Sequence, residues 1–110
     1  MNQLLQDKKI EGYWYSESEE NKRYPVPIPN ILTDSEALTI HQLIKIKEGQ
    51  SYKLNYKGLS TSRITGEFVG CSEYHHPDGW VWPIAFGDHY VLLHKVRPSE
   101  EFLKFIGYTK

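Results

Sequence analysis

Apolar and polar residues alternate along the middle of the chain, and this period of two predicts β-strands. From Tyr52 to Lys57 every second side chain is aromatic or aliphatic, and Lys or Asn lies between them. Residues 76–79 read His-Pro-Asp-Gly, which is typical of a tight turn between two strands. The pattern as a whole predicts a short antiparallel sheet over about residues 51–82, with strands at residues 51–58, 61–68, 71–75 and 80–82.

The spacing becomes helical in front of this sheet. Thr33 and Glu36 form a capping-box pattern, which predicts the start of a helix, and Gly49 suits its end. The apolar face of this helix is predicted to contain Leu38, His41 (or Gln42), Leu43 and Ile46.

Two further helices are expected after the sheet. Pro83 fits the first turn of a helix that reaches about His94, because a proline there removes no intrahelical hydrogen bond. A last short helix opens with Pro-Ser-Glu-Glu at residues 98–101. Its apolar face is predicted to consist of Phe102, Phe105 and Ile106.

The N-terminal part combines aromatic and proline-rich segments. Residues 10–15 favour a short strand, because three adjacent aromatic residues suit a half-buried pleated surface. Residues 24–29 alternate proline with other residues, which predicts an extended strap across the outside of the core. Val26 and Ile28 of this strap are expected to pack against the core. Together with the sheet and helices, this predicts a small α+β fold in a single domain of residues 1–110.

Composition and charge narrow the class of protein. The 110 residues are 39% hydrophobic, which is enough for one core, and the net charge of -1 provides no general attraction to nucleic acid or anionic membranes. The single cysteine cannot form an internal disulfide, so we expect a reducing, cytoplasmic location. The start of the chain lacks the apolar stretch of a signal peptide, and no apolar run is long enough to span a membrane. We therefore expect no membrane partner.

The second half of the chain contains a series of short motifs. They are Tyr-Lys-Gly-Leu-Ser at residues 56–60, Ser-Arg-Ile-Thr-Gly at 62–66, Trp-Val-Trp-Pro at 80–83, His-Tyr with a second His at 89–94, and Val-Arg-Pro-Ser-Glu-Glu-Phe at 96–102. In this order they resemble a family of small uncharacterised bacterial proteins. The pattern of that family is a Tyr-Arg-Gly-Trp/Phe-Ser lead, a Cys-Arg-x-Cys-Gly knuckle, an Asn-Gly-Ser turn, a Trp-Pro, a His-Tyr-x3-His helix and a Val-Arg-Pro tail.

The resemblance implies a zinc centre of two cysteines and two histidines, and this chain departs from that pattern at the cysteines. Ser62 and Thr65 occupy the two knuckle positions, and neutral hydroxyls do not replace thiolates as zinc ligands. The implication is that this chain keeps the fold and has lost the metal, so we expect no cofactor. Cys71 with His89 and His94 forms a reduced alternative ligand set, although structural zinc sites use four ligands as a rule.

Histidines can act as general bases, and a hydrolase that uses His75, His76 or His89 is one alternative function. Against it, His75 and His76 are expected at an exposed hairpin tip, on opposite sides of the strand end, with no nucleophile beside them. On an ideal α-helix His89 and His94 differ by about 140° and do not share one face. We therefore assign no catalytic residue and favour a protein that is not an enzyme.

An aromatic and acidic surface is the main candidate for a binding function. The candidate partner-binding residues are Trp14, Glu17, Glu19, Glu20, Trp80 and Trp82. An acidic loop beside aromatic side chains suits a basic partner such as a nuclease toxin. The leading hypothesis is therefore a non-enzymatic protein-binding module, such as an immunity or antitoxin protein that neutralises a cytosolic effector.

A nucleic-acid-associated module is the second hypothesis. Lys53 and Lys57 share the polar face of one predicted strand, and Arg63 follows it, so that a basic patch interleaved with aromatics could meet RNA or DNA. Such a protein would be derived from a zinc-ribbon-like domain that has lost its metal. The net charge of -1 and the absence of a recognition motif argue for an ordinary solvated sheet face instead.

Overall fold

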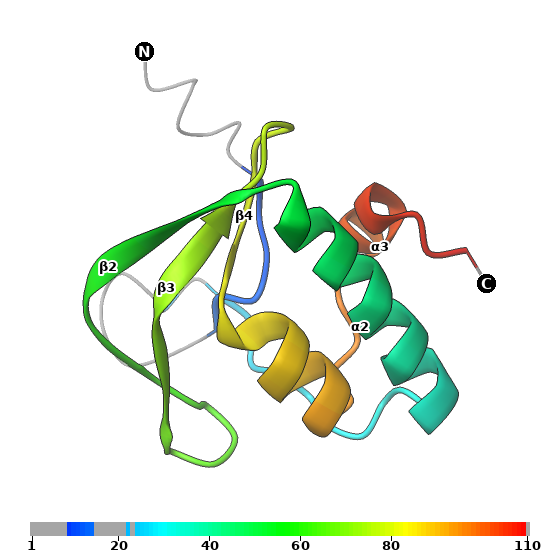
Figure 1. The fold of residues 1–110 in the computed structure, drawn as a ribbon. Helices are drawn as coiled ribbons and strands as arrows, with labels where there is room; N and C mark the ends of the chain where they lie inside the picture. Colours follow the sequence, from blue (N-terminus) through cyan, green and yellow to red (C-terminus); the bar gives the residue numbers. More distant parts are fainter. Residues whose placement is uncertain (1–8, 15–21, 23, 110) are drawn as a thin grey trace.

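The computed structural model describes residues 9–14, 22 and 24–109, without the side chains of residues 56–60. Its elements are, in order, β1 (Lys9–Ile10), α2 (Asp34–Gly49), β2 (Tyr52–Thr61), β3 (Phe68–His75), β4 (Trp80–Pro83), η2 (Phe86–Leu93) and α3 (Glu100–Ile106). The helices α2, η2 and α3 lie together on one side of the sheet (Figure 1). The architecture is a small α+β fold with one helix before the main strands and two after them, which confirms the predicted fold class.

The four-stranded sheet is mixed, where the sequence predicts a wholly antiparallel one. Its strand order is β1-β4-β3-β2. Strands β2, β3 and β4 pair antiparallel as predicted, but β1 runs parallel to β4, with Lys9 beside Trp80. The strand predicted at residues 10–15 is wrong in its extent, because β1 comprises only Lys9–Ile10 and residues 11–14 are not in a strand.

The first predicted strand is longer than expected, and the strand predicted at residues 61–68 is wrong. β2 continues from Tyr52 to Thr61, and residues 62–67 are the loop that leads into β3. The predicted boundary at Gly58 is wrong because the pairing of β2 with β3 shifts register between Asn55 and Ser60. Such an irregularity absorbs a glycine without ending the strand.

Two of the three predicted helix starts are confirmed in atomic detail. The third is wrong, because Pro83 is the last residue of β4 and η2 begins at Phe86. The Thr33 hydroxyl accepts a hydrogen bond from the Glu36 amide at 3.1 Å, and the Glu36 carboxylate accepts one from the Thr33 amide at 2.8 Å. This is the reciprocal capping box that the sequence predicts. The hydroxyl of Ser99 caps α3 by accepting from the Phe102 amide at 3.2 Å, and α3 ends at Gly107, whose φ is 86°.

The buried face of α2 differs from the predicted one. Leu38 and Ile46 are 51% and 59% exposed. The residues that α2 buries are Ala37, Ile40, Ile44 and Glu48. Both sets repeat at intervals of three and four residues, so periodicity alone does not decide which set faces the core. Packing against η2 and α3 makes that choice.

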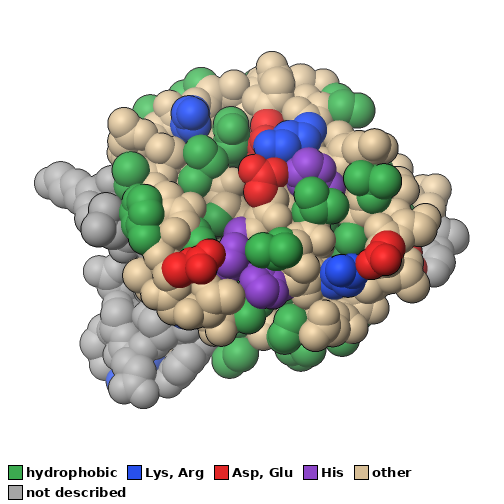
Figure 2. All heavy atoms as spheres, turned by 60° about the horizontal axis from the view of Figure 1, so that its bottom comes forward, with side chains coloured by type: hydrophobic (Ala, Val, Ile, Leu, Met, Phe, Trp, Pro, Cys, Tyr) green, Lys and Arg blue, Asp and Glu red, His purple; other side chains and the backbone are tan. Residues whose placement is uncertain are grey.

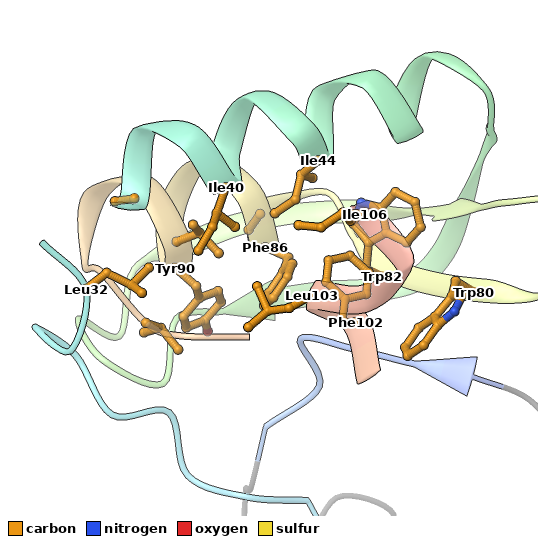
Figure 3. Close-up of a cluster of buried hydrophobic side chains, with 14 residues drawn as sticks. Leu32, Ile40, Ile44, Trp80, Trp82, Phe86, Tyr90, Phe102, Leu103 and Ile106 are labelled. Atoms are coloured by element: carbon orange, nitrogen blue, oxygen red, sulfur yellow. The ribbon is translucent and has the colours of Figure 1, made fainter. Parts of the chain in front are cut away.

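Aromatic side chains from β4, η2 and α3 form the centre of the core (Figure 3). Trp82, Phe86 and Phe102 are fully buried, and Trp80 is 8% exposed. The Trp80 ring stacks on Phe105 with centroids 5.4 Å apart and meets Phe102 edge-on at 5.2 Å. The prediction that Trp80 and Trp82 form a partner-binding surface is therefore wrong, because both rings are used inside the protein.

The proline-rich strap lies outside the core without forming a strand, as predicted. Its packing is the reverse of the expectation, because Val26 and Ile28 are 62% and 61% exposed while Pro27 is buried. The amide of Asn30 donates to the His94 carbonyl at 2.8 Å, so the end of the strap is bonded to the end of η2.

Candidate functional site

The loop of residues 62–67 is organised around the hydroxyl of Ser62. This oxygen accepts hydrogen bonds from the amides of Ile64 and Thr65, both at 3.0 Å. The amide of Gly66 donates to the Ser62 carbonyl at 2.9 Å, and its φ of +81° is a left-handed conformation that favours glycine. The result is a tight knuckle with the position-62 side chain at its centre.

Helix η2 faces this knuckle and has the π-helical pattern, with hydrogen bonds between residues five apart. The His94 amide donates to the His89 carbonyl at 3.1 Å, and the two imidazole rings meet edge to face with centroids 4.7 Å apart. The expectation that these histidines lie on different faces is therefore wrong. It assumed α-helical geometry, and a π-turn brings residues five apart onto the same side.

A hydrogen bond joins the knuckle to the helix. Ser62 Oγ lies 2.8 Å from His89 Nε2, and the Arg63 amide donates to the Tyr90 hydroxyl at 3.0 Å. Because the two lone pairs of the Ser62 hydroxyl accept backbone amides, its proton is the one that goes to His89. His89 Nε2 is then the acceptor, and the ring proton sits on Nδ1.

Burial also favours the neutral form of this histidine. Burial lowers the pKa of His89, the neighbouring His94 lowers it further, and Glu67 opposes the shift. His94 Nε2 is itself buried and has no hydrogen-bond partner among the residues that the structure describes. The Nε2 atom of His89 therefore has a hydrogen-bond partner, and among the described residues the Nε2 atom of His94 has none.

A serine beside a histidine is also the arrangement of a nucleophile and its base. Here the serine is 3% exposed and the histidine 8% exposed, and the serine oxygen already accepts two backbone amides. A substrate carbonyl has no route to that oxygen, and no lone pair is left to attack it. The contact between Ser62 and His89 therefore does not support the hydrolase hypothesis.

The zinc centre implied by the resemblance does not fit the residues present. The hydroxyl at position 62 is neutral and hydrogen-bonded, and Thr65 Oγ1 accepts the Glu67 amide at 3.3 Å. Among residues 9–14, 22 and 24–109, no three His, Cys, Asp or Glu side chains are grouped so that they could hold a metal ion. The reduced ligand set of Cys71, His89 and His94 is therefore not assembled.

The other two candidate histidines lie on separate networks. His75 Nε2 is 2.8 Å from Glu73, whose other oxygen accepts from the Tyr13 hydroxyl, and its ring stacks on Tyr52. His76 is buried at 9% exposure beneath the 76–79 turn, so the prediction of an exposed tip is wrong for it. Among the described residues, neither histidine forms a hydrogen bond with a serine or cysteine, and both serve the packing around β3.

A charged network that the sequence analysis missed joins α2 to η2. His41 Nε2 lies 2.7 Å from Asp88, and Lys45 bridges Asp88 at 3.2 Å and Glu48 at 3.3 Å. Burial acts to raise the pKa of Asp88, but the hydrogen bonds from His41 and Lys45 outweigh it and lower that pKa. Figure 2 shows histidine, basic and acidic side chains together on this face. Residues 41, 45 and 48 are spaced so that they share one face of a helix, and this spacing is the sequence signal that could have predicted the network.

An apolar hollow lies between the N-terminal segment and the strap. It measures about 470 Å³, and Tyr13, Trp14 and Tyr24 line it together with the strap residues Val26 and Ile28. The indole Nε1 of Trp14 is buried without a hydrogen-bond partner among the described residues. Trp14 is half-buried: it lines this hollow, and its ring also packs against Phe86 and Tyr90 of the core.

The remaining predicted binding residues are only partly placed. Glu17, Glu19 and Glu20 lie outside the described residues, in the segment that connects Trp14 with Tyr24. The side chain of Lys57 also lies outside them. Lys53 is near the start of β2 and Arg63 lies beyond its end, so ten residues of extended chain, roughly 30 Å, separate them. The Arg63 guanidinium folds back onto the Thr61 carbonyl at 2.6 Å. The described residues therefore do not form a single basic patch.

Comparison with known proteins identifies no relative: no family model, no curated protein and no solved structure matches this chain. Within the described part of the chain, no helix has the length and apolar character needed to cross a membrane.

Proposed function

We propose that this protein is a non-enzymatic protein-binding module that holds a basic partner through the hollow beside Trp14. The observation that carries the proposal is the apolar hollow itself. It is lined by aromatic rings, and the strap residues Val26 and Ile28 at its edge are each more than half exposed. Exposed apolar groups gathered around a concavity are typical of interaction sites.

The chemistry of the partner follows from the sequence that adjoins two residues of this hollow. The stretch that joins Trp14 to Tyr24 contains three glutamates together with Lys22 and Arg23, so it is acidic on balance, and Trp14 and Tyr24 both line the hollow. Acidic groups next to an aromatic site favour a partner that presents Lys or Arg around one large apolar side chain. A basic cytosolic effector, such as a nuclease toxin that this protein would neutralise, has these properties.

Selection from a random peptide library tests the proposal without a known partner. Phage-displayed 12-residue peptides are selected on the immobilised protein, and bound sequences are compared with the input library. We expect enrichment of peptides with basic residues around one Trp, Leu or Phe. Enrichment of acidic or purely polar peptides would contradict the proposed chemistry.

Two exposed isoleucines provide a matched pair of variants for that experiment. Ile28 lines the hollow and is 61% exposed, whereas Ile46 lies on α2 and is 59% exposed. Ile28→Asp should weaken the binding of a selected peptide by at least about tenfold, which is the loss of about 1.4 kcal/mol. Ile46→Asp should leave the affinity unchanged. Equal effects of the two substitutions would show that the hollow is not the binding surface.

A further inference from the structure

The junction between the 62–67 loop and η2 has features that ordinary packing does not require. A π-helical turn is rare and is less favourable than an α-helical one, so it persists where something holds it. In η2 this turn places the rings of His89 and His94 against each other. Their neighbour is the knuckle oxygen of Ser62, 2.8 Å from His89 Nε2.

The knuckle is shaped to stabilise a negative charge on the side chain at position 62. Two backbone amides point at the Ser62 oxygen from the second and third residues after it. Amides in this arrangement stabilise an anion more than a neutral hydroxyl, and a cysteine at the same position would have its thiolate stabilised by them. Residue 65 lies three positions later, which is the ligand spacing of a metal-binding knuckle.

The unsatisfied nitrogen of His94 is the second independent observation. Its Nε2 is buried and bonded to nothing among the described residues. Buried polar atoms normally have a partner, so an orphaned one marks a place where a partner has been removed or has yet to be supplied. A metal ion held also by residues 62, 65 and 89 would take up the lone pair of this nitrogen.

We propose that positions 62, 65, 89 and 94 form the frame of a four-ligand metal site in which the Ser62–His89 hydrogen bond has replaced the metal ion. The disagreement between this chain and the zinc centre of the family that it resembles is thus confined to two side chains. Three of the four positions already lie together, since Ser62 Oγ is 2.8 Å from His89 Nε2 and the rings of His89 and His94 are 4.7 Å apart. Position 65 lies in the same knuckle, where its amide donates to the Ser62 hydroxyl. Thiolates at positions 62 and 65 would complete a tetrahedral set of two sulfurs and two imidazole nitrogens.

Restoring the thiolates tests this inference directly. The variant Ser62→Cys/Thr65→Cys is prepared with Cys71→Ser, so that no other thiol is present, and zinc is counted by native mass spectrometry. Binding of Co²⁺ in place of zinc is followed through its visible absorption, which reports tetrahedral thiolate coordination. We expect one ion per chain and a melting temperature that rises with zinc and falls when a chelator removes it.

The matched control removes one histidine from the same variant. Loss of a residue that only orients a ligand already costs about 10–100-fold in metal affinity, so adding His94→Ala should weaken zinc binding by more than that. Equal affinity with and without His94, or a folded cysteine variant that binds no zinc, would overturn the proposal.

If the cysteine variant does not fold, a single substitution in the natural sequence tests the proposal instead. His94→Phe keeps an aromatic ring against His89 and removes both ring nitrogens, although the phenyl ring is slightly larger than the imidazole. Because the proposal leaves Nε2 without a native partner, the melting temperature of this variant should equal or exceed that of the natural protein. A clearly lower melting temperature would contradict the proposal.

Discussion

Both ring nitrogens of His76 are hydrogen-bonded, and this makes the fold sensitive to protons. The Asp78 amide donates to Nδ1 at 3.0 Å, so Nδ1 is unprotonated and Nε2 donates to the Gln50 side chain at 2.8 Å. Burial lowers the pKa of His76; Asp78 opposes this shift, and Lys47 adds to it. Protonation at Nδ1 would remove the bond that holds the turn.

The direction of the pH dependence follows from that lowered pKa. Above about pH 6.5 the histidine is neutral in both the folded and the unfolded chain, so its stabilising contribution is complete. As the pH falls from there towards the folded pKa, the unfolded chain binds the proton first and stability decreases, by at most about 1.4 kcal/mol per pH unit. His76→Asn, which can still accept from the Asp78 amide, should have a flatter curve of unfolding free energy between pH 6.5 and 5. His89 contributes equally to both curves, and identical slopes would contradict this role of His76.

Glu48 places a carboxylate inside the core and gives the Trp82 indole its acceptor. Trp82 Nε1 donates to Glu48 at 3.2 Å, and Lys45 pairs with the other oxygen. Glu48→Leu should lower the unfolding free energy by about 1–3 kcal/mol, because it leaves a buried donor unpaired. Glu48→Gln keeps an acceptor and should cost clearly less in the same urea titration. A leucine variant as stable as the glutamine variant would show that the indole bond is dispensable.

At the scale of elements, the sequence correctly predicts the features that depend only on residues close together in the chain. The starts of α2 and α3 follow from capping residues within three positions of each other, and both are confirmed. Helix η2 has a π-helical pattern and bonds to the knuckle, 27 residues earlier, and a local pattern contains no trace of either feature. The buried face of α2 likewise depends on its neighbours, since Ile40 and Leu38 are equally apolar but only the first meets the core.

Loss of the two capping side chains should lower the unfolding free energy by different amounts, because the Ser99 hydroxyl also bonds to Glu11. Thr33→Ala removes a cap and should cost about 1 kcal/mol of unfolding free energy. Ser99→Ala removes a cap and also the hydroxyl that donates to Glu11 at 2.7 Å, a carboxyl whose pKa burial raises in spite of the Ser99 hydrogen bonds. We therefore expect a larger loss, about 2 kcal/mol, in a parallel thermal or urea denaturation. A loss no larger than that of Thr33→Ala would place Glu11 outside the stabilising contacts.

At the scale of the molecule, contacts between distant residues attach the N-terminal segment. Its strand β1 has two residues, so most of the attachment comes from side chains and single hydrogen bonds. The Glu11 amide donates to the Val81 carbonyl at 3.0 Å, and its carboxylate accepts from Ser99, 88 residues away. Sequence patterns predict no pairing over such separations. For this reason the hollow beside Trp14 becomes visible only in the folded protein, although Trp14 itself is a predicted binding residue.

Gly12 provides the sharpest test of how this segment is held, because Gly66 is its natural control. Both have left-handed φ angles, +82° and +81°, so alanine is strained at either position by about 1 kcal/mol. They differ in space: a Cβ at Gly12 would lie 2.6 Å from the Phe86 ring, whereas a Cβ at Gly66 would meet nothing within 4 Å. Gly12→Ala should therefore cost about 2–4 kcal/mol and displace Tyr13 and Trp14 from the hollow, while Gly66→Ala should cost only the strain. Binding of a selected peptide should be lost in the first variant and retained in the second. If Gly12→Ala binds the peptide as tightly as Gly66→Ala does, the position of Trp14 against the core is not what forms the binding surface.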